Sequence, residues 1–366
     1  MVQTAGRQHV IEALNLKPLP SIQITPDRWI GDDQPCFVIA EVGQNHNGQM
    51  SIARELIDNI AFHKADAVKF CKRHIPSELT AEAYNRPYFG PQSFGDTYGQ
   101  HREALELSRE QYKELKAHAL AQGALFFSTA CDIQSVDDLE DVGVPMYKVA
   151  SRDLTNLPLL DYMASTGKPV ILSCGMDPLP LIKEAIDTIR KHHNNIILLQ
   201  CTSSYPTPYN EVNMLAMHTL RKEFDVLTGM SDHTIGYTVS VVSASLGAVA
   251  VEKHVTLARH MKGTDHACSL EPDGLRRTVR DIRNMEQALG DGVKRVTDLV
   301  AGARVKLCRS LVSRQPIVAG TVLDESMVCL KSPGGGLLWR ERDQVMGKKA
   351  QRDIPADVTL ELKDFA

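Results

Sequence analysis

The sequence has no run of about 18 consecutive apolar residues, the length that an apolar helix needs to cross a bilayer. None of its eight cysteines form a CxxC pair, and three of them, Cys36, Cys174 and Cys201, lie in or beside apolar, strand-like runs. Residues 1–17 lack the apolar run and small-residue cleavage site of a signal peptide. We therefore expect a soluble cytoplasmic protein with buried free thiols and no membrane partner.

The chain also lacks an excess of positive charge. It has 41 Lys and Arg residues against 45 Asp and Glu residues, a formal net charge of -4, whereas a nucleic-acid-binding protein presents a basic face. Its 366 residues, 43% of them hydrophobic, fit one large domain with a small appendage, because single cores rarely grow far beyond about 250–300 residues. We expect no nucleic-acid partner.

Short apolar runs alternate eight times with longer helical patterns. The predicted strands span residues 36–41, 67–71, 125–129, 146–150, 170–173, 196–202, 226–230 and 249–254. The predicted helices span residues 51–63, 109–122, 133–142, 157–165, 181–192, 212–224, 237–246 and 271–289. The strands are almost continuously apolar, which is typical of parallel strands covered on both faces. Eight consecutive units predict a closed (β/α)₈ barrel rather than an open sheet.

Two regions depart from this repeat. Residues 75–107 form a long connection with several aromatic residues, which is typical of a substrate lid or an interface element. We assign residues 1–297 to the barrel with an N-terminal extension, 298–307 to a helical linker, and 308–366 to a small β-rich domain. Its predicted strands span residues 310–313, 319–323, 333–336 and 354–360. This domain is near the lower size limit for independent stability, so we expect it to pack on the barrel or on a second subunit.

Polar or ionisable side chains end nearly every predicted strand, and the active sites of (β/α)₈ enzymes lie at these carboxyl ends. Lys69 and Lys148 lie within apolar strands, where an unpaired charge is costly. Together with Ser151, Ser173 and Ser231 they suit a phosphate group, because lysine supplies a point charge and serine supplies a hydroxyl donor. The alternative is that the lysines belong to salt bridges in the barrel core.

His233 and His254 end the seventh and eighth predicted strands. Either one alone is more often a hydrogen-bonded polar residue than a metal ligand. As a pair on neighbouring strand ends they predict a divalent metal site, because neutral imidazole binds such ions well. Two protein ligands leave positions open for water and substrate, so we expect Mn²⁺ or Mg²⁺.

Three further residues near the strand ends have two interpretations each. Glu41 either handles a proton or a sugar hydroxyl, or accepts a hydrogen bond from the following loop. His46 either transfers a proton or anchors that loop. Asp265, which follows the eighth strand, either binds substrate hydroxyls or is an ordinary loop residue.

Six motifs on these strand ends together resemble the sialic acid synthases, which condense phosphoenolpyruvate with an N-acetylmannosamine-type sugar. They read IAEVGQNHNG at 39–48, YKVAS at 147–151, ILSCGM at 171–176, CTSSYP at 201–206, GMSDH at 229–233 and VEKH at 251–254. RSLV at 309–312 and GKKA at 347–350 are similar to the antifreeze-protein-like SAF domain of that family. The resemblance covers residues 28–366, and the loop at 86–101 is closer to the animal-type synthases.

The resemblance implies roles for residues at matching positions. Phosphoenolpyruvate would contact Lys69, Lys148, Ser151, Ser173, Ser203 and Ser231. The acceptor sugar would contact Glu41, Cys71, Tyr205 and Asp265. His233 and His254 would hold the metal, with Glu252 supporting it, and with Glu41 they would form the catalytic set. The family also implies a homodimer in which each SAF domain covers the partner's barrel.

The sequence departs from the family pattern at four positions. Cys71 stands where the family commonly has Gln, Ser203 where Asn is frequent, Arg152 where Gly is usual, and Ser332 in place of an Arg of the small domain. Arg152 either pairs with Asp153 or adds to anion binding. These departures put the identity of the acceptor sugar in doubt.

The expected reaction forms a carbon–carbon bond and yields a nonulosonic acid, or its 9-phosphate if the sugar is a 6-phosphate, with inorganic phosphate. A sister synthase that makes legionaminic, pseudaminic or deaminated sialic acid is the nearest alternative. A non-catalytic binding protein that retains the barrel is a second alternative, from a different functional class.

Overall fold

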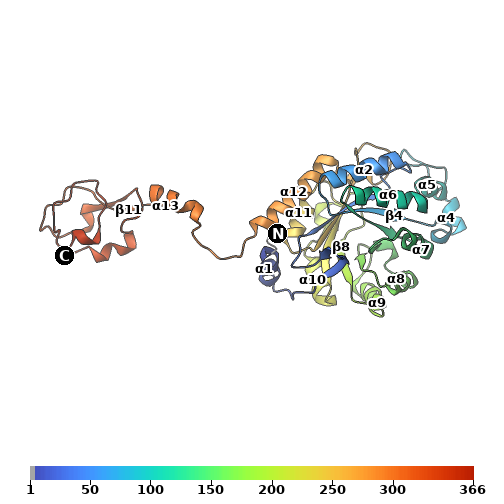
Figure 1. Cartoon of the computed structure of the whole chain (residues 1–366), viewed down its shortest axis with the longest axis horizontal. Helices are drawn as coiled ribbons and strands as arrows, with labels where there is room; N and C mark the ends of the chain where they lie inside the picture. Colours follow the sequence, from blue (N-terminus) through green and yellow to red (C-terminus); the bar gives the residue numbers. More distant parts are fainter. Residues whose placement is uncertain (1–4) are drawn as a thin grey trace. The chain divides into compact units, whose positions relative to one another are not determined.

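The computed structural model describes residues 5–366 and divides between Gly292 and Val293 into two compact units. Residues 1–4, part of the segment expected to lack a signal peptide, lie outside the described residues. In the first unit eight parallel strands close into a barrel, in the order β10, β3, β4, β5, β6, β7, β8, β9. Helices surround this barrel (Figure 1), and the predicted (β/α)₈ fold is confirmed.

The barrel elements follow the predicted alternation closely. Its strands are β3 (Phe37–Gly43), β4 (Ala67–Lys72), β5 (Leu125–Ala130), β6 (Tyr147–Val149), β7 (Val170–Ser173), β8 (Ile196–Cys201), β9 (Leu227–Asp232) and β10 (Ala250–His254). Its main helices are α2 (Met50–Phe62), α6 (Arg109–Ala121), α7 (Ile133–Val142), α8 (Leu157–Ser165), α9 (Leu179–Arg190), α10 (Ala216–Phe224), α11 (Thr238–Ser245) and α12 (Pro272–Ala288). Short 3₁₀ turns follow several strands, namely η1 (Ser151–Asp153), η2 (Tyr209–Glu211) and η3 (His266–Cys268).

Local sequence explains where these elements begin and end. Every residue of β3 is buried, as a strand inside a ring of helices requires. The side chain of Asp132 accepts a hydrogen bond from the backbone of Ser135 and so begins α7. Gly143 ends that helix with φ of 78°, a left-handed conformation that glycine adopts without a Cβ penalty.

The cysteine thiols agree with the compositional expectation. All eight cysteines are free, and Cys36, Cys174 and Cys201 are buried as predicted. Within residues 5–366, no helix combines the length and apolar character needed to cross a membrane.

The N-terminal extension contains structure that the sequence patterns did not predict. Helix α1 (Ala5–Ala13) precedes a two-stranded antiparallel hairpin of β1 (Ile22–Thr25) and β2 (Arg28–Ile30). Strands of three and four residues are too short to give a periodic pattern. After the hairpin, Asp32 forms a buried, bidentate ion pair with Arg221 of α10, and one of its two contacts is 3.1 Å long. This ion pair attaches the extension to the barrel.

We expect Arg221→Met to lower the free energy of unfolding by about 3–5 kcal/mol, because it leaves the Asp32 carboxylate buried without its partner. Urea unfolding followed by circular dichroism measures this change. The matched control is Arg276→Met, which removes an exposed ion pair with Asp273 and should change stability little. An equal effect of the two substitutions would contradict the prediction.

The connection between β4 and α6 is more ordered than an open loop. It contains three short helices, α3 (Ile75–Glu78), α4 (Ala81–Asn85) and α5 (Tyr98–Ala104). Aromatic contacts consolidate it, because the ring of Tyr88 lies 4.6 Å from that of His101 and 5.5 Å from that of Tyr98. The connection therefore folds as a small packed unit, as its aromatic content indicates.

The second unit has less regular strand structure than predicted. It contains η4 (Asp298–Val300), α13 (Ala301–Leu307), β11 (Ser310–Ser313), η5 (Glu325–Met327), β12 (Val328–Lys331), η6 (Trp339–Gln344) and η7 (Leu362–Asp364). Of the predicted strands, 310–313 is confirmed, whereas 319–323, 333–336 and 354–360 form no strand, and β12 was missed. Isolated bridges at Val322, Ile354 and Thr359 replace extended ladders. A buried apolar cluster that includes Leu311 and Val345 stabilises this turn-rich unit.

Candidate functional site

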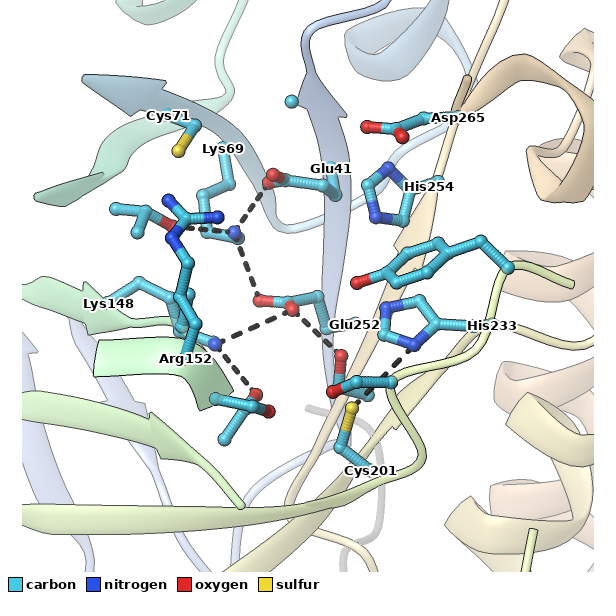
Figure 2. Close-up of a pocket in the computed structure, with 18 of the residues that line it drawn as sticks. Glu41, Lys69, Cys71, Lys148, Arg152, Cys201, His233, Glu252, His254 and Asp265 are labelled. Atoms are coloured by element: carbon cyan, nitrogen blue, oxygen red, sulfur yellow. Dashed lines mark hydrogen bonds and ion pairs between the residues drawn. The ribbon is translucent and has the colours of Figure 1, made fainter. Parts of the chain in front are cut away.

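The predicted site residues meet in one pocket at the carboxyl ends of the barrel strands (Figure 2). The pocket is lined by Glu41, Lys69, Cys71, Lys148, Ser151, Ser173, Ser203, Tyr205, Ser231, His233, Glu252, His254 and Asp265. Their roles remain predictions, but their convergence is a property of the fold, because the barrel brings the ends of all its strands to one face.

Two buried lysines and two buried carboxylates form a network across the pocket floor. The Lys69 Nζ atom lies 2.7 Å from Glu41, 3.5 Å from Glu252 and 3.0 Å from the Thr129 hydroxyl. The Lys148 Nζ atom lies 3.7 Å from Glu252. The lysines therefore form ion pairs in the barrel core and also line the pocket. The salt-bridge interpretation and the phosphate-binding interpretation of these two residues are thus compatible.

Serine hydroxyls extend this network along the pocket wall. Lys148 Nζ donates a hydrogen bond of 2.7 Å to Ser173, and Ser231 donates one of 2.9 Å to Glu252. Ser151 accepts a hydrogen bond of 2.8 Å from the backbone N–H of Gly175. A Cβ atom on Gly175 would lie only 2.5 Å from the Ser203 hydroxyl, so glycine lets the backbone approach the serines here.

The pKa values of Glu41 and Glu252 are shifted in opposite directions. Burial raises the pKa of Glu41 to about 8 despite the nearby Lys69. Burial acts in the same direction on Glu252, but Lys148 and Lys69 outweigh it and lower the pKa of Glu252 below its usual value. Paired carboxyl groups with separated pKa values suit an acid–base division of roles, with a proton available on Glu41.

His233 and His254 present free ring nitrogens beside each other. The Nδ1 atom of His233 lies 2.9 Å from the Thr202 carbonyl oxygen, which fixes the proton on Nδ1 and leaves the Nε2 lone pair free. The Nδ1 atom of His254 is buried and has no hydrogen-bond partner among residues 5–366, and burial lowers the pKa of this ring to about 4. Burial also acts to lower the pKa of His233, but its hydrogen bond with Cys201 outweighs burial, so the pKa of His233 is raised. The ring centroids are 5.5 Å apart, and both rings line the pocket.

The acceptor side of the pocket, as implied by the resemblance, is formed by Glu41, Cys71, Tyr205 and Asp265. The Tyr205 ring lies 4.0 Å from that of His233, and Figure 2 shows Asp265 close to His254. His46, in contrast, is buried outside the pocket and accepts a hydrogen bond from the Gly48 backbone at 3.1 Å. The loop-anchoring interpretation therefore describes His46.

The sequence patterns assigned no site role to several polar residues that line the pocket, namely Gln44, Arg73, Thr129 and Arg152. Arg73 directly follows β4, and Thr129 lies near the carboxyl end of β5. Arg152, a departure from the family pattern, lies 3.4 Å from Asp153, which agrees with the pairing interpretation. The position of Arg73 just beyond a strand end is the sequence signal that indicates it.

Cys71 belongs to a pair of thiols in the pocket wall. Its Sγ atom lies 3.5 Å from that of Cys131, and Cys131 in turn accepts a hydrogen bond of 2.9 Å from Arg152. Hydrogen bonding from Cys131, together with the positive charges of Arg73, Arg152 and Lys69, holds the pKa of Cys71 well below its usual value despite burial. Cys71 is therefore expected to carry thiolate character at neutral pH.

We expect iodoacetamide to alkylate Cys71 at least about tenfold faster than Cys36 at pH 7, because the thiolate is the reactive species. Cys36 is the internal control, since it is also buried and burial raises its pKa to about 11. Peptide mass spectrometry over a time course gives both rates in one sample. Equal rates at the two positions would show that Cys71 is not ionised.

Two family models match this chain. Residues 56–294 match the NeuB family and residues 309–366 match the SAF domain. The human N-acetylneuraminate-9-phosphate synthase is 37% identical, covering 93% of this chain and 95% of the human protein. The N,N'-diacetyllegionaminic acid synthase of Campylobacter jejuni is also 37% identical, over 88% of this chain and 97% of its own. A crystal structure of the N-acetylneuraminic acid synthetase of Leptospira borgpetersenii, 30% identical, superposes with a TM-score of 0.68, covering 78% of this chain and 95% of that one.

Proposed function

Because the chain belongs to the NeuB family and carries a SAF domain, we propose that it condenses phosphoenolpyruvate with an N-acetylmannosamine-type sugar and water. The products are a nonulosonic acid, or its 9-phosphate, and inorganic phosphate. The observation that carries this proposal is the convergence of two lysines, four serines and two histidines on one pocket, in a chain whose relatives are named synthases of such acids.

Phosphoenolpyruvate binds to the lysine and serine side of the pocket. Lys148 and Lys69 supply positive charge, and Ser151, Ser173, Ser203 and Ser231 supply hydroxyl groups. Ser151 is held by the backbone of Gly175, Ser173 by Lys148 and Ser231 by Glu252, so these three serines need little reorganisation when the substrate binds. Preorganised donors also stabilise the charge that develops as phosphate leaves.

The acceptor sugar binds on the opposite side, as its open-chain aldehyde. Carbon C3 of phosphoenolpyruvate attacks the aldehyde carbon and forms the new carbon–carbon bond. Water then adds at C2, and the tetrahedral intermediate expels phosphate. Glu41, with its raised pKa, is positioned to hold a proton near the aldehyde oxygen, while Tyr205 and Asp265 orient the sugar hydroxyls.

His233 and His254 fit a divalent metal. His233 offers Nε2, and His254 has a buried Nδ1 atom that no other group satisfies. Among residues 5–366 no group of three His, Cys, Asp or Glu side chains forms a complete metal cage, so water and substrate would fill the remaining positions. A bound Mn²⁺ or Mg²⁺ would supply Lewis acidity toward the acceptor carbonyl.

The decisive experiment incubates the protein with phosphoenolpyruvate, Mn²⁺ and a panel of hexosamines and their 6-phosphates. Coupled phosphate release reports turnover, and mass spectrometry of the product identifies the acid formed. A sister synthase would respond to a legionaminic or pseudaminic acid precursor, or to unsubstituted mannose. Phosphoenolpyruvate binding by calorimetry without phosphate release from any sugar would instead support the non-catalytic alternative.

The same family membership supports a proposal about the assembly. We propose a cytoplasmic homodimer in which each SAF domain covers the barrel of the partner. The small size of the second unit supports this, because a core of this size gains stability from a neighbour. A monomeric mass by light scattering at micromolar concentration would contradict it.

A further inference from the structure

Four cationic side chains line the pocket, and their hydrogen-bonding differs sharply. Lys69 and Lys148 already donate to hydroxyl or carbonyl oxygens and lie beside carboxylates. Arg73 is 6% exposed, yet its guanidinium donates no hydrogen bond to any residue from 5 to 366. Its Nε atom lies 3.4 Å from Glu78, within ion-pair range but without hydrogen-bond geometry. The buried Nε atom is thus left without a hydrogen bond, and the other donors of this guanidinium have no acceptor among residues 5–366. Because Arg73 lines the pocket, these donors are available to an anion bound there.

Arg152 reaches the same wall of the pocket from the turn after β6. Its Nη2 atom lies 3.7 Å from Glu78, the carboxylate that also pairs with Arg73, so the two guanidinium groups are neighbours. Glu78 and Asp153 hold the arginines without lining the pocket themselves. The carboxylates therefore support the arginines from behind, and the arginines face the cavity.

We infer that Arg73 and Arg152 form a subsite for a phosphate monoester carried by the acceptor sugar. Guanidinium groups present parallel donors that match phosphate oxygens, which makes arginine suited to this recognition. The inference rests on the proposed function, since it specifies which acceptor the enzyme uses. The phosphate ester is bound but does not react.

The position of the arginines favours the acceptor over phosphoenolpyruvate. Arg73 lies two residues beyond Cys71, and Arg152 donates to Cys131, whose sulfur is 3.5 Å from that of Cys71. Cys71 occupies an acceptor-contacting position by resemblance to the family. Figure 2 shows the Arg152 guanidinium on the Cys71 side of the pocket, near Lys69.

The relatives include enzymes named for both kinds of product. The human relative is named for a 9-phosphate, which corresponds to a phosphorylated acceptor, whereas the Campylobacter jejuni relative is named for an acid without phosphate. Both are 37% identical to this chain, so overall identity does not decide between them. The pair formed by Arg73 and Arg152 favours the phosphorylated acceptor.

The test compares N-acetylmannosamine with its 6-phosphate as acceptors at saturating phosphoenolpyruvate. We expect the wild type to prefer the 6-phosphate at least about tenfold in kcat/KM. Arg73→Gln and Arg152→Gly should each lower kcat/KM for the 6-phosphate about 10²-fold. In both variants kcat/KM for the neutral sugar and the KM for phosphoenolpyruvate should change less than about threefold. Arg73→Lys should recover part of the lost kcat/KM, because lysine restores the positive charge but not the parallel donors of a guanidinium group.

The matched control is Arg280→Gln, an exposed arginine on α12, which should leave all three constants unchanged. The inference would be overturned if the wild type used the two sugars equally well. It would also be overturned if Arg73→Gln raised the KM for phosphoenolpyruvate instead of lowering kcat/KM for the 6-phosphate. Calorimetric titration of N-acetylmannosamine 6-phosphate without phosphoenolpyruvate separates the two proposals. If neither sugar is turned over but Arg73→Gln weakens this binding at least about tenfold, the proposed function fails and the subsite stands. Unchanged binding would remove the subsite.

Discussion

Replacing His254 by Ala should lower kcat on the order of 10²–10³-fold and abolish stoichiometric metal binding. The reason is geometric, because His254 has a buried ring nitrogen without a hydrogen-bond partner in the described part of the chain, next to the free Nε2 atom of His233. Two measurements check the result: the activity with phosphoenolpyruvate and its acceptor, and the metal content by mass spectrometry after dialysis. A chelator should abolish the activity of the wild type, and added Mn²⁺ should restore it.

The control for this prediction is His118→Ala. His118 lies on the outer helix α6, where it pairs with Asp58, so its loss should leave both metal content and kcat unchanged. His233→Ala should behave like His254→Ala, since a two-histidine site depends on both ligands. Full activity of the wild type in chelator would exclude a catalytic metal, and normal metal content in His254→Ala would place the ion elsewhere.

Lys148→Met should reduce kcat/KM for phosphoenolpyruvate about 10²–10³-fold, roughly 3–4 kcal/mol of lost transition-state stabilisation. The substitution removes a buried cation from the phosphate side of the pocket and the hydrogen bond that holds Ser173. It also leaves Glu252 with only Lys69 to balance its charge. Steady-state kinetics with varied phosphoenolpyruvate measures the loss.

The control distinguishes substrate binding from damage to the fold. Lys253 is an equally buried strand lysine, but it pairs with Asp232 at 3.2 Å and does not line the pocket. Lys253→Met should therefore lower the unfolding temperature without raising the KM for phosphoenolpyruvate. If Lys148→Met lowers only the unfolding temperature and leaves that KM within about twofold, then Lys148 is structural.

The barrel itself was predictable because its strands carry their own signature. Runs such as that in β3 are apolar at every position, and the helices between them follow the 3.6-residue period. The strands of the small unit were harder to predict, because outside the β11–β12 ladder its strand pairing consists of single bridges such as Val322 with Lys349, which leave no periodic pattern. Short segments and isolated bridges depend on tertiary packing rather than on local preference.

The (β/α)₈ architecture and the residues that meet at its carboxyl face were evident from the sequence patterns, because the closure of parallel strands requires their ends to converge. The same patterns indicated that His233 and His254 are strand-end neighbours. The balance of charges across the pocket, in contrast, was visible only in the folded chain: Lys69 lies between Glu41 and Glu252, and the Arg73 Nε atom is buried without a hydrogen-bonded partner among residues 5–366. A charge is balanced by groups that lie near it in space, and those groups come from different strands and turns of the barrel.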